Sequence, residues 1–405
     1  MDRTRFALVL LLSPAWLGVA SYGEIAAQPL PLGPETRVDT LVRSKPNHPV
    51  IAVQRDGTFE IAWDYWEFQP ASIFVRHFDA AGRPTSSAQV LLGSEGYFPQ
   101  VDSIIKAGKG YDVLWHVDHD TGPAISFYTR HLDAGGVPLG EKPLKAGKPF
   151  LRYMWFSAGD GLIGGYYAAA LRTLELRKVS PNGVPTLQQR RINTSELDSP
   201  TPFIQSLANG GFVAVIQGTI PDDTTQQVLR ARLFDGKFEP VGPDFDLNTV
   251  PAGVARKPPF LAQYFAVAAA PDGGFGVAWK LGDTLYVRVF DAAGHAAAAE
   301  AAVLTTDKII VPESLAFDSS GNLLLLWLEA EVSEPFRSDV QIQLFDRNGV
   351  ALGPSEGVNS VASGRYQMPF NGSVAWANGS WLVTWQAEVE DLASTAIFVR
   401  RFAGH

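Results

Sequence analysis

The phrase VRVFDAAG, residues 287–294, decides the fold, because the nearly identical phrase VRHFDAAG occurs at residues 75–82. Degenerate copies of the phrase recur along the chain, with anchor residues at Phe78, Leu132, Val179, Phe234, Phe290, Phe345 and Phe402. Successive anchors are 54, 47, 55, 56, 55 and 57 residues apart. A near-constant period of this length is typical of solenoids and propellers.

The copy at residues 267–304 is the most regular and contains four strand-like runs. The first run ends at the turn from Asp272 to Gly274, whose glycines accept the positive φ of a tight hairpin. The second run, FGVAW, ends at Trp279, and the third, TLYVRVF, ends at Phe290 before a turn into the fourth, AEAAVL. Four other copies carry a tryptophan at the Trp279 position: Trp63, Trp115, Trp327 and Trp385.

Short strands at even spacing, without a helical period, predict an all-β fold. Seven units of four strands predict a seven-bladed β-propeller of four-stranded antiparallel blades. The last copy ends without a fourth strand, whereas residues 35–43 form a strand-like run before the first copy. We expect this N-terminal strand to pair with the last blade and close the ring, because closure leaves no terminal blade edge unpaired.

The repeat unit resembles a known repeat type. Units of the form RxFDxxGxPxG followed by DGGFxVxW are similar to propeller-type repeats of proteins exported by bacteria. The resemblance covers essentially the whole mature chain and implies a propeller. It matches no specific functional family, so no functional residues are carried over.

The first residues predict export. Arg3 and Arg5 precede an apolar run that is interrupted by Pro14 and followed by small residues, which is typical of a signal peptide. We expect a signal peptide within residues 1–27, cleaved after residue 20 or residue 27, and a single propeller domain at residues 35–405. The mature chain is expected to be secreted, periplasmic or extracellular, without a transmembrane segment. It contains no cysteine, so neither disulfides nor a lipid-modified cysteine holds it in place.

The net charge of −9 disfavours a polyanion such as nucleic acid as a partner. We expect a glycan, peptide or protein ligand and no cofactor. Arginines recur two residues before most anchors, and tryptophans recur in the second strands. Because a feature present in nearly every blade rarely defines one site, we interpret both sets as scaffold.

Loops of variable length predict where a site would lie. The second-to-third loops and the links between blades fall on one face of the ring and vary widely, and variable loops on a rigid scaffold often bind ligands. The residues expected on this ligand-binding face are Tyr65, Trp66, Phe68, His116, Tyr153, Trp155, Tyr264, Phe265 and Tyr366. The alternative is that the aromatic residues only cap the blade edges.

The loop HVDHDTG, residues 116–122, gathers potential metal ligands. Asp118, Asp120 and Gly122 form only part of a calcium loop, and no distant ligand that would complete a zinc site is identifiable. We therefore expect no metal and keep Asp118 and Asp120 as weak candidates.

The chain lacks the usual catalytic motifs, among them Gly-x-Ser-x-Gly and His-Glu-x-x-His. We expect an exported binding or interaction module rather than an enzyme, either acting alone or as part of a larger surface assembly. The alternative is a propeller hydrolase or lyase that acts on extracellular polysaccharide through a pair of loop carboxylates. The candidates for such a pair are Asp222, Asp223, Glu329, Glu331, Glu388 and Glu390.

Overall fold

A computed structural model describes most of the chain. The described residues are 28–40, 45–65, 72–85, 88–90, 97–118, 125–140, 144–146, 154–158, 161–168, 173–179, 185–194, 196–220, 223–249, 265–332, 338–359, 371–388 and 395–404. They form β-strands joined by turns, and no helix among them is long and apolar enough to cross a membrane.

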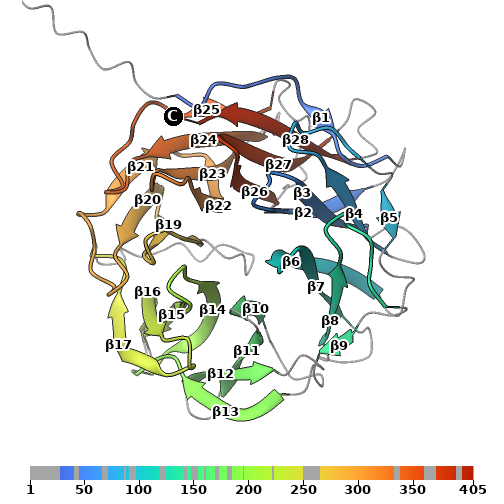
Figure 1. Cartoon of the computed structure of the whole chain (residues 1–405). Coiled ribbons are helices and arrows are strands. Elements are labelled where there is room, and N and C mark those ends of the chain that lie inside the picture. The colour runs from blue at the N-terminus through green and yellow to red at the C-terminus, as the bar shows by residue number, and fades with distance from the viewer. Residues whose placement is uncertain are drawn as a thin grey trace, which may run out of the picture.

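The strands form seven four-stranded antiparallel sheets, which Figure 1 shows arranged around a common axis. Sheet 1 contains β2 (Pro46–Val53), β3 (Phe59–Tyr65), β4 (Ser72–Phe78) and β5 (Gln89–Val90). Sheet 2 contains β6 (Tyr97–Ala107), β7 (Gly110–Asp118), β8 (Ile125–Leu132) and β9 (Leu144–Ala146). Sheet 3 contains β10 (Met154–Ala158), β11 (Gly161–Ala168), β12 (Thr173–Val179) and β13 (Pro185–Arg191). Sheets 4 and 5 contain β14 (Asp198–Ser206), β15 (Phe212–Ile220), β16 (Asp223–Phe234) and β17 (Pro240–Asp246); and β18 (Phe265–Ala269), β19 (Phe275–Leu281), β20 (Thr284–Phe290) and β21 (Ala301–Thr305). Sheets 6 and 7 contain β22 (Ile309–Phe317), β23 (Leu323–Ala330), β24 (Ser338–Phe345) and β25 (Glu356–Gly357); and β26 (Gly372–Ala377), β27 (Ser380–Glu388), β28 (Thr395–Ala403) and β1 (Thr36–Arg37).

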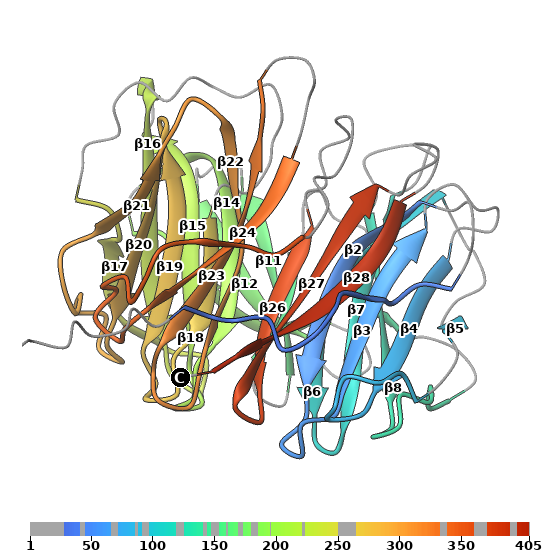
Figure 2. The same cartoon turned by 90° about the horizontal axis from the view of Figure 1, so that it is seen from above.

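The first strand of each sheet lies nearest the axis, and we call these the inner strands. Each inner strand contacts the inner strand of the next sheet, and the series returns from β26 to β2. Figure 2 shows the sheets from the side, with their strands running between the two faces of the ring. The predicted all-β, repeat-built propeller arrangement is confirmed.

The N-terminal segment joins sheet 7, but as a shorter strand than the sequence predicted. β1 covers two residues, not residues 35–43, and its Thr36 pairs with Val399 of β28. Hydrogen bonds continue the pairing on both sides, from the Leu32 N–H to the Arg401 carbonyl and from the Val38 N–H to the Ile397 carbonyl. β1 (blue) therefore lies along the outer side of β28 (red) in Figure 1.

Most of the repeated arginines fasten one sheet to the sheet before it. Arg288 donates through Nη1 to the Leu247 carbonyl at 2.9 Å, and Leu247 directly follows β17 of the preceding sheet. The guanidinium also lies over the Phe290 ring. Three other arginines make the same backward contact: Arg232 to Arg191 and Ile192, Arg400 to Val358, and Arg76 to Val38. These contacts support the interpretation of the arginines as scaffold.

Val38 occupies the same place after β1 that Val358 occupies after β25. The Val358 N–H donates to the Val340 carbonyl, and Asn359 Oδ1 accepts the Val340 N–H at 2.9 Å. The N-terminal segment repeats this pattern, because Asp39 Oδ1 accepts the Ile397 N–H at 2.8 Å. The segment thus has the contacts of a fourth strand.

The second-strand tryptophans fill the space between neighbouring sheets. Trp63, Trp115, Trp279, Trp327 and Trp385 are all buried. Burial of such large side chains is a major contribution to stability, and it agrees with the structural role expected from the sequence.

Candidate functional site

The inner wall of the ring holds buried and partly buried acidic and imidazole groups, beginning with His48 in sheet 1. His48 lies in a β-bulge of β2 between Asn47 and Val50, and its φ is 49°. A non-glycine residue with positive φ is uncommon and costs backbone strain. Its Nδ1 lies 2.8 Å from Oδ2 of Asp64. Bulges often redirect a side chain beside a functional site.

Asp64 connects sheet 1 with sheet 2. Its side chain is fully buried, and Oδ2 also accepts the Val101 N–H of β6 at 3.0 Å. The other oxygen, Oδ1, is buried and has no hydrogen-bond partner among the described residues. Burial raises the pKa of Asp64, and the nearby His48 partly offsets this effect.

Asp102 and His116 form a second carboxyl–imidazole pair in the same seam. Asp102 lies in a bulge of β6 between Val101 and Ser103, and its Oδ1 is 2.7 Å from Nδ1 of His116. Its Oδ2 is buried without a partner among the residues that the structure describes. We call His48, Asp64, Asp102 and His116 the inner-wall cluster.

Polar contacts continue from this cluster into sheet 7. The Gln386 amide donates to Asn47 Oδ1 at 2.8 Å, and the Thr395 hydroxyl donates to the Pro46 carbonyl at 3.1 Å. Glu388 ends β27, and burial raises its pKa. The polar groups therefore extend over three consecutive sheets, on the side where the second strands end.

Glu313 lies midway along the inner strand of sheet 6. It is the bulged residue of β22 between Pro312 and Ser314. Its Oε2 accepts the Gly372 N–H of sheet 7 at 3.2 Å, and its Oε1 is buried without a partner in the described part of the chain. Burial raises the pKa of Glu313 to about 8.

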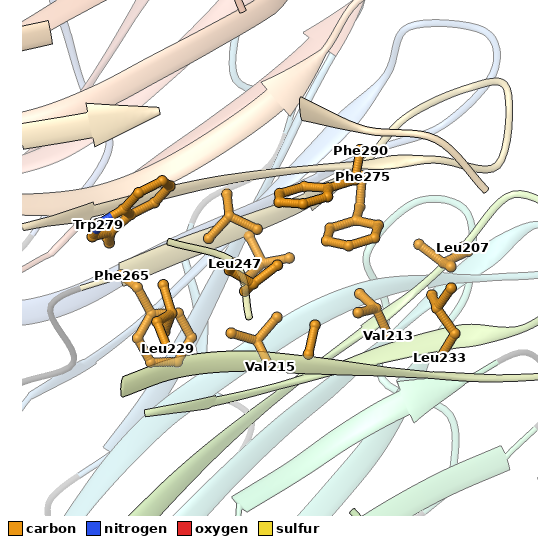
Figure 3. Packing of buried hydrophobic residues seen from close by; sticks show 13 residues of the cluster. Leu207, Val213, Val215, Leu229, Leu233, Leu247, Phe265, Phe275, Trp279 and Phe290 are labelled. Atoms are coloured by element: carbon orange, nitrogen blue, oxygen red, sulfur yellow. The ribbon is translucent and has the colours of Figure 1, made fainter. Parts of the chain in front are cut away.

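Two of the predicted ligand-binding residues are buried. Tyr65 is fully buried and packs edge-on against Phe74. Phe265 is buried among apolar side chains of sheets 4 and 5, near Leu229 and Val215 (Figure 3). Each side chain packs in the core at one end of a strand, and its part in ligand binding stays a prediction.

The remaining predicted positions have different outcomes. His116 belongs to the inner-wall cluster. Trp155 is described by its backbone in β10 but not by its side chain. The other predicted aromatic residues lie outside the described residues: Trp66, Phe68, Tyr153, Tyr264 and Tyr366. Their place on the ligand-binding face stays a prediction.

The weak metal candidates and the loop carboxylates are only partly described. Asp118 ends β7 without a described side chain, and Asp120 lies outside the described residues. Within the described ranges, no three acidic, histidine or cysteine residues are placed to hold a metal ion. Glu329 and Glu331 both lie within 3.5 Å of Lys308 Nζ, which makes them a local ion-pair network.

A hollow lies at the other end of the inner strands. It has a volume of about 440 Å³ and is bordered by residues where β14, β18, β22 and β26 end, including Trp376 and Phe317. Small side chains form much of the rest of its lining, and the Asp318 carboxylate is already used by the adjacent turn. The hollow therefore offers few polar groups that would select a ligand.

Sequence reasoning missed most of the inner-wall residues. The signal was an acidic residue inside an otherwise apolar first strand, in VDSI (residues 101–104) and PESL (residues 312–315). In both, the acidic residue directly follows the residue that pairs with the second-strand tryptophan. Asp102 and Glu313 therefore occupy equivalent bulges of two inner strands.

Comparison with known proteins assigns no family. No family model matches the chain, and no curated protein matches it. Among solved structures, a protein of unknown function from Dyadobacter fermentans has 9% identity and a TM-score of 0.52, over 93% of this chain and 99% of that one. The endosialidase of phage phi92 has 9% identity and a TM-score of 0.51, over 94% of this chain and 72% of that one. At such identities these similarities show the fold alone.

Proposed function

We propose that the chain binds an uncharged, hydroxyl-rich ligand of the glycan class at the inner wall and the adjoining variable-loop face. The observation that carries the proposal is the pair of buried acceptor oxygens, Asp64 Oδ1 and Asp102 Oδ2, without partners among the described residues. A buried acceptor without a donor is costly, and sugar hydroxyl groups are suitable donors. The strained backbone of His48 supports a functional role for the same seam.

The charge of the site supports a ligand without strong negative charge. The whole chain carries a net charge of −9, and two of its carboxyl groups, Asp64 and Asp102, lie in the seam itself. A polyanionic ligand would face repulsion from both. The main alternative is a cationic ligand, and a binding screen distinguishes neutral glycans from cationic ligands.

A glycan array probed with the full chain tests this proposal. Replacing Asp102 with Ala should weaken capture of neutral oligosaccharides at least about tenfold, because one hydrogen bond to a charged group is lost. His131→Ala is a matched control, since His131 and Asp112 form a similar pair at 2.8 Å in the same sheet but are more exposed. Capture of only cationic probes, or equal losses in both variants, would contradict the proposal.

Cleavage of the bound glycan is the second candidate function. It is favoured by the equivalent bulges of Asp102 and Glu313, because among the described residues Asp102 is paired with an imidazole and Glu313 with a backbone N–H. Two carboxyl groups in unlike environments are the arrangement that acid–base catalysis requires. Glu313 would give its proton to the glycosidic oxygen as the C–O bond breaks. The Asp102–His116 pair would take a proton from the water that attacks the sugar carbon.

Release of new reducing ends from a captured oligosaccharide measures this activity. If the chain is a hydrolase, Glu313→Gln should slow release at least about a hundredfold while the ligand is still captured. Capture by the unmodified chain without any release would exclude catalysis and leave the binding function.

We also propose that the sheets form one closed seven-bladed ring, with the segment around β1 as the fourth member of sheet 7. The contact between β26 and β2 and the bond from Arg76 to Val38 support closure. The export signal in residues 1–27 and a location outside the cytoplasm belong to the same proposal. A ring exported in this way would meet extracellular glycans.

A further inference from the structure

Glu313 differs from the other acidic groups of the inner wall in the residues that surround it. It projects from a bulge at the seam between sheets 6 and 7, where Gly372 begins the neighbouring inner strand. The Gly372 N–H is the partner of one carboxyl oxygen. A side chain on Gly372 would meet Leu326, because a Cβ there would lie 2.6 Å from Leu326 Cδ2. The chain at Gly372 therefore has no room for a side chain.

The strands packed against β22 bring little charge to this carboxyl group. The inner strands on either side, β18 and β26, contain no titratable residue. β23 contributes Glu329, which is held by Lys308 and by the Trp327 indole N–H. β19 contributes Lys280, whose own pKa is lowered by burial. No ion pair with Glu313 occurs among the described residues, so nothing there stabilises its ionised form by charge.

Burial is consequently the dominant influence on this group. It raises the pKa of Glu313 from 4.5 to about 8, although the Gly372 N–H acts in the opposite direction. At neutral pH most of the population then carries a proton on this carboxyl group. A protonated carboxyl group has an O–H donor as well as acceptor capacity.

We infer that Glu313 is a hydrogen-bond donor of the ligand site. Its carboxyl O–H donates to an uncharged acceptor, such as a sugar ring oxygen or hydroxyl oxygen. This rests on the proposed glycan-binding function and narrows it. One side of the site, in sheets 1 and 2, accepts hydrogen bonds, whereas the sheet 6 and 7 seam donates one. A ligand that both donates and accepts, as sugars do, satisfies both sides, whereas an ammonium group has no acceptor for the Glu313 O–H.

Difference infrared spectroscopy of the full chain against Glu313→Gln tests the protonated state without any ligand. We expect the carbonyl band of a protonated carboxyl group at neutral pH and its loss as the pH rises through about 8. A carboxylate band alone at neutral pH would overturn the inference. Because no glycan is needed, this outcome is independent of whether the proposed function holds.

Stability gives a second readout. A buried acid with a raised pKa binds its proton more tightly in the folded state, so folding loses stability as pH rises from 4.5 towards 8. Glu313→Gln removes this dependence, so its melting temperature should exceed that of the unmodified chain by a margin that grows over this range. Parallel pH curves for the two chains would contradict a buried proton.

Capture of neutral oligosaccharides on an array tests whether the Glu313 O–H contacts the ligand. Glu313→Gln keeps a donor group and should retain capture, whereas Glu313→Ala should lose about tenfold, the effect of one hydrogen bond. Equal capture by the two variants and the unmodified chain would remove Glu313 from the site. If no neutral probe is captured at all, the proposed function fails while the infrared result still decides the state of Glu313.

Discussion

Removing residues 28–40 should destabilise the folded chain by about 5 kcal/mol, because sheet 7 loses its outermost strand. Val38 is fully buried, and its carbonyl accepts a hydrogen bond from Arg76 of sheet 1. Its N–H and the Asp39 carboxylate together satisfy the backbone of Ile397. Truncation leaves these groups unpaired and exposes β28 as an open edge, which also favours aggregation. Denaturant unfolding followed by tryptophan fluorescence measures the loss.

Truncation at residue 27 is the matched control for this experiment. That chain keeps all of the pairing between the N-terminal segment and β28 and should unfold at the same denaturant concentration as the full chain. Asp39→Ala should fall between the two, because it removes only the bond to the Ile397 N–H and the contact with Arg37. Equal midpoints for the two truncated chains would show that the N-terminal segment does not close the ring.

Replacing Trp327 with Ala should cost about 3 to 5 kcal/mol of unfolding free energy, the usual range for a buried aromatic residue. The side chain is buried with residues of sheets 5 and 6, among them Leu285 and Val287. Its indole N–H also donates to Glu329 Oε1 at 3.0 Å. The change therefore leaves a cavity between two sheets and an acceptor without its donor. Chemical denaturation of the purified variant measures the cost.

Two further variants make the result interpretable. Trp327→Phe keeps most of the volume and should lose less than Trp327→Ala. Val332→Ala lies just beyond the same strand, is 58% exposed and should change stability by no more than about 0.5 kcal/mol. If Trp327→Ala is as stable as Val332→Ala, the tryptophans are not the filling between sheets.

The propeller could be predicted because its signals are local. The turn from Asp291 to Gly294 is determined by its own residues. Asp291 Oδ1 accepts the N–H groups of Ala293 and His295, and Gly294 adopts a φ of 85°. Such turns repeat with the period of the chain, and so do the second-strand tryptophans. Periodicity in the sequence therefore reports periodicity in space.

Local rules fail where packing overrides them. Phe238 stands where other copies have the turn glycine and adopts a φ of 71°, held by its burial against Phe212 and Phe234. The N-terminal strand shows the same limit. Its composition predicted a strand over residues 35–43, but among the described residues of this run the strand proper covers Thr36 and Arg37, because the partners on β28 decide where pairing occurs.

The candidate site was harder to predict because its contacts are distant in sequence. His48 and Asp64 meet across a hairpin, and Asp64 reaches Val101 in the next sheet. The sequence predicted loop positions for Tyr65 and Phe265, yet both side chains are buried, because Tyr65 is the last residue of β3 and Phe265 is the first residue of β18. Buried polar groups on inner strands are visible only once neighbouring sheets are in place.

Hydrogen exchange with and without a captured neutral oligosaccharide tests the central claim, that the ligand lies against the inner wall. We expect ligand-dependent protection in the peptides that contain His48, Asp102 and Glu313, and none in the turns from Asp79 to Gly82 and from Asp291 to Gly294. Protection confined to those turns, or to the hollow beside Trp376, would contradict the account.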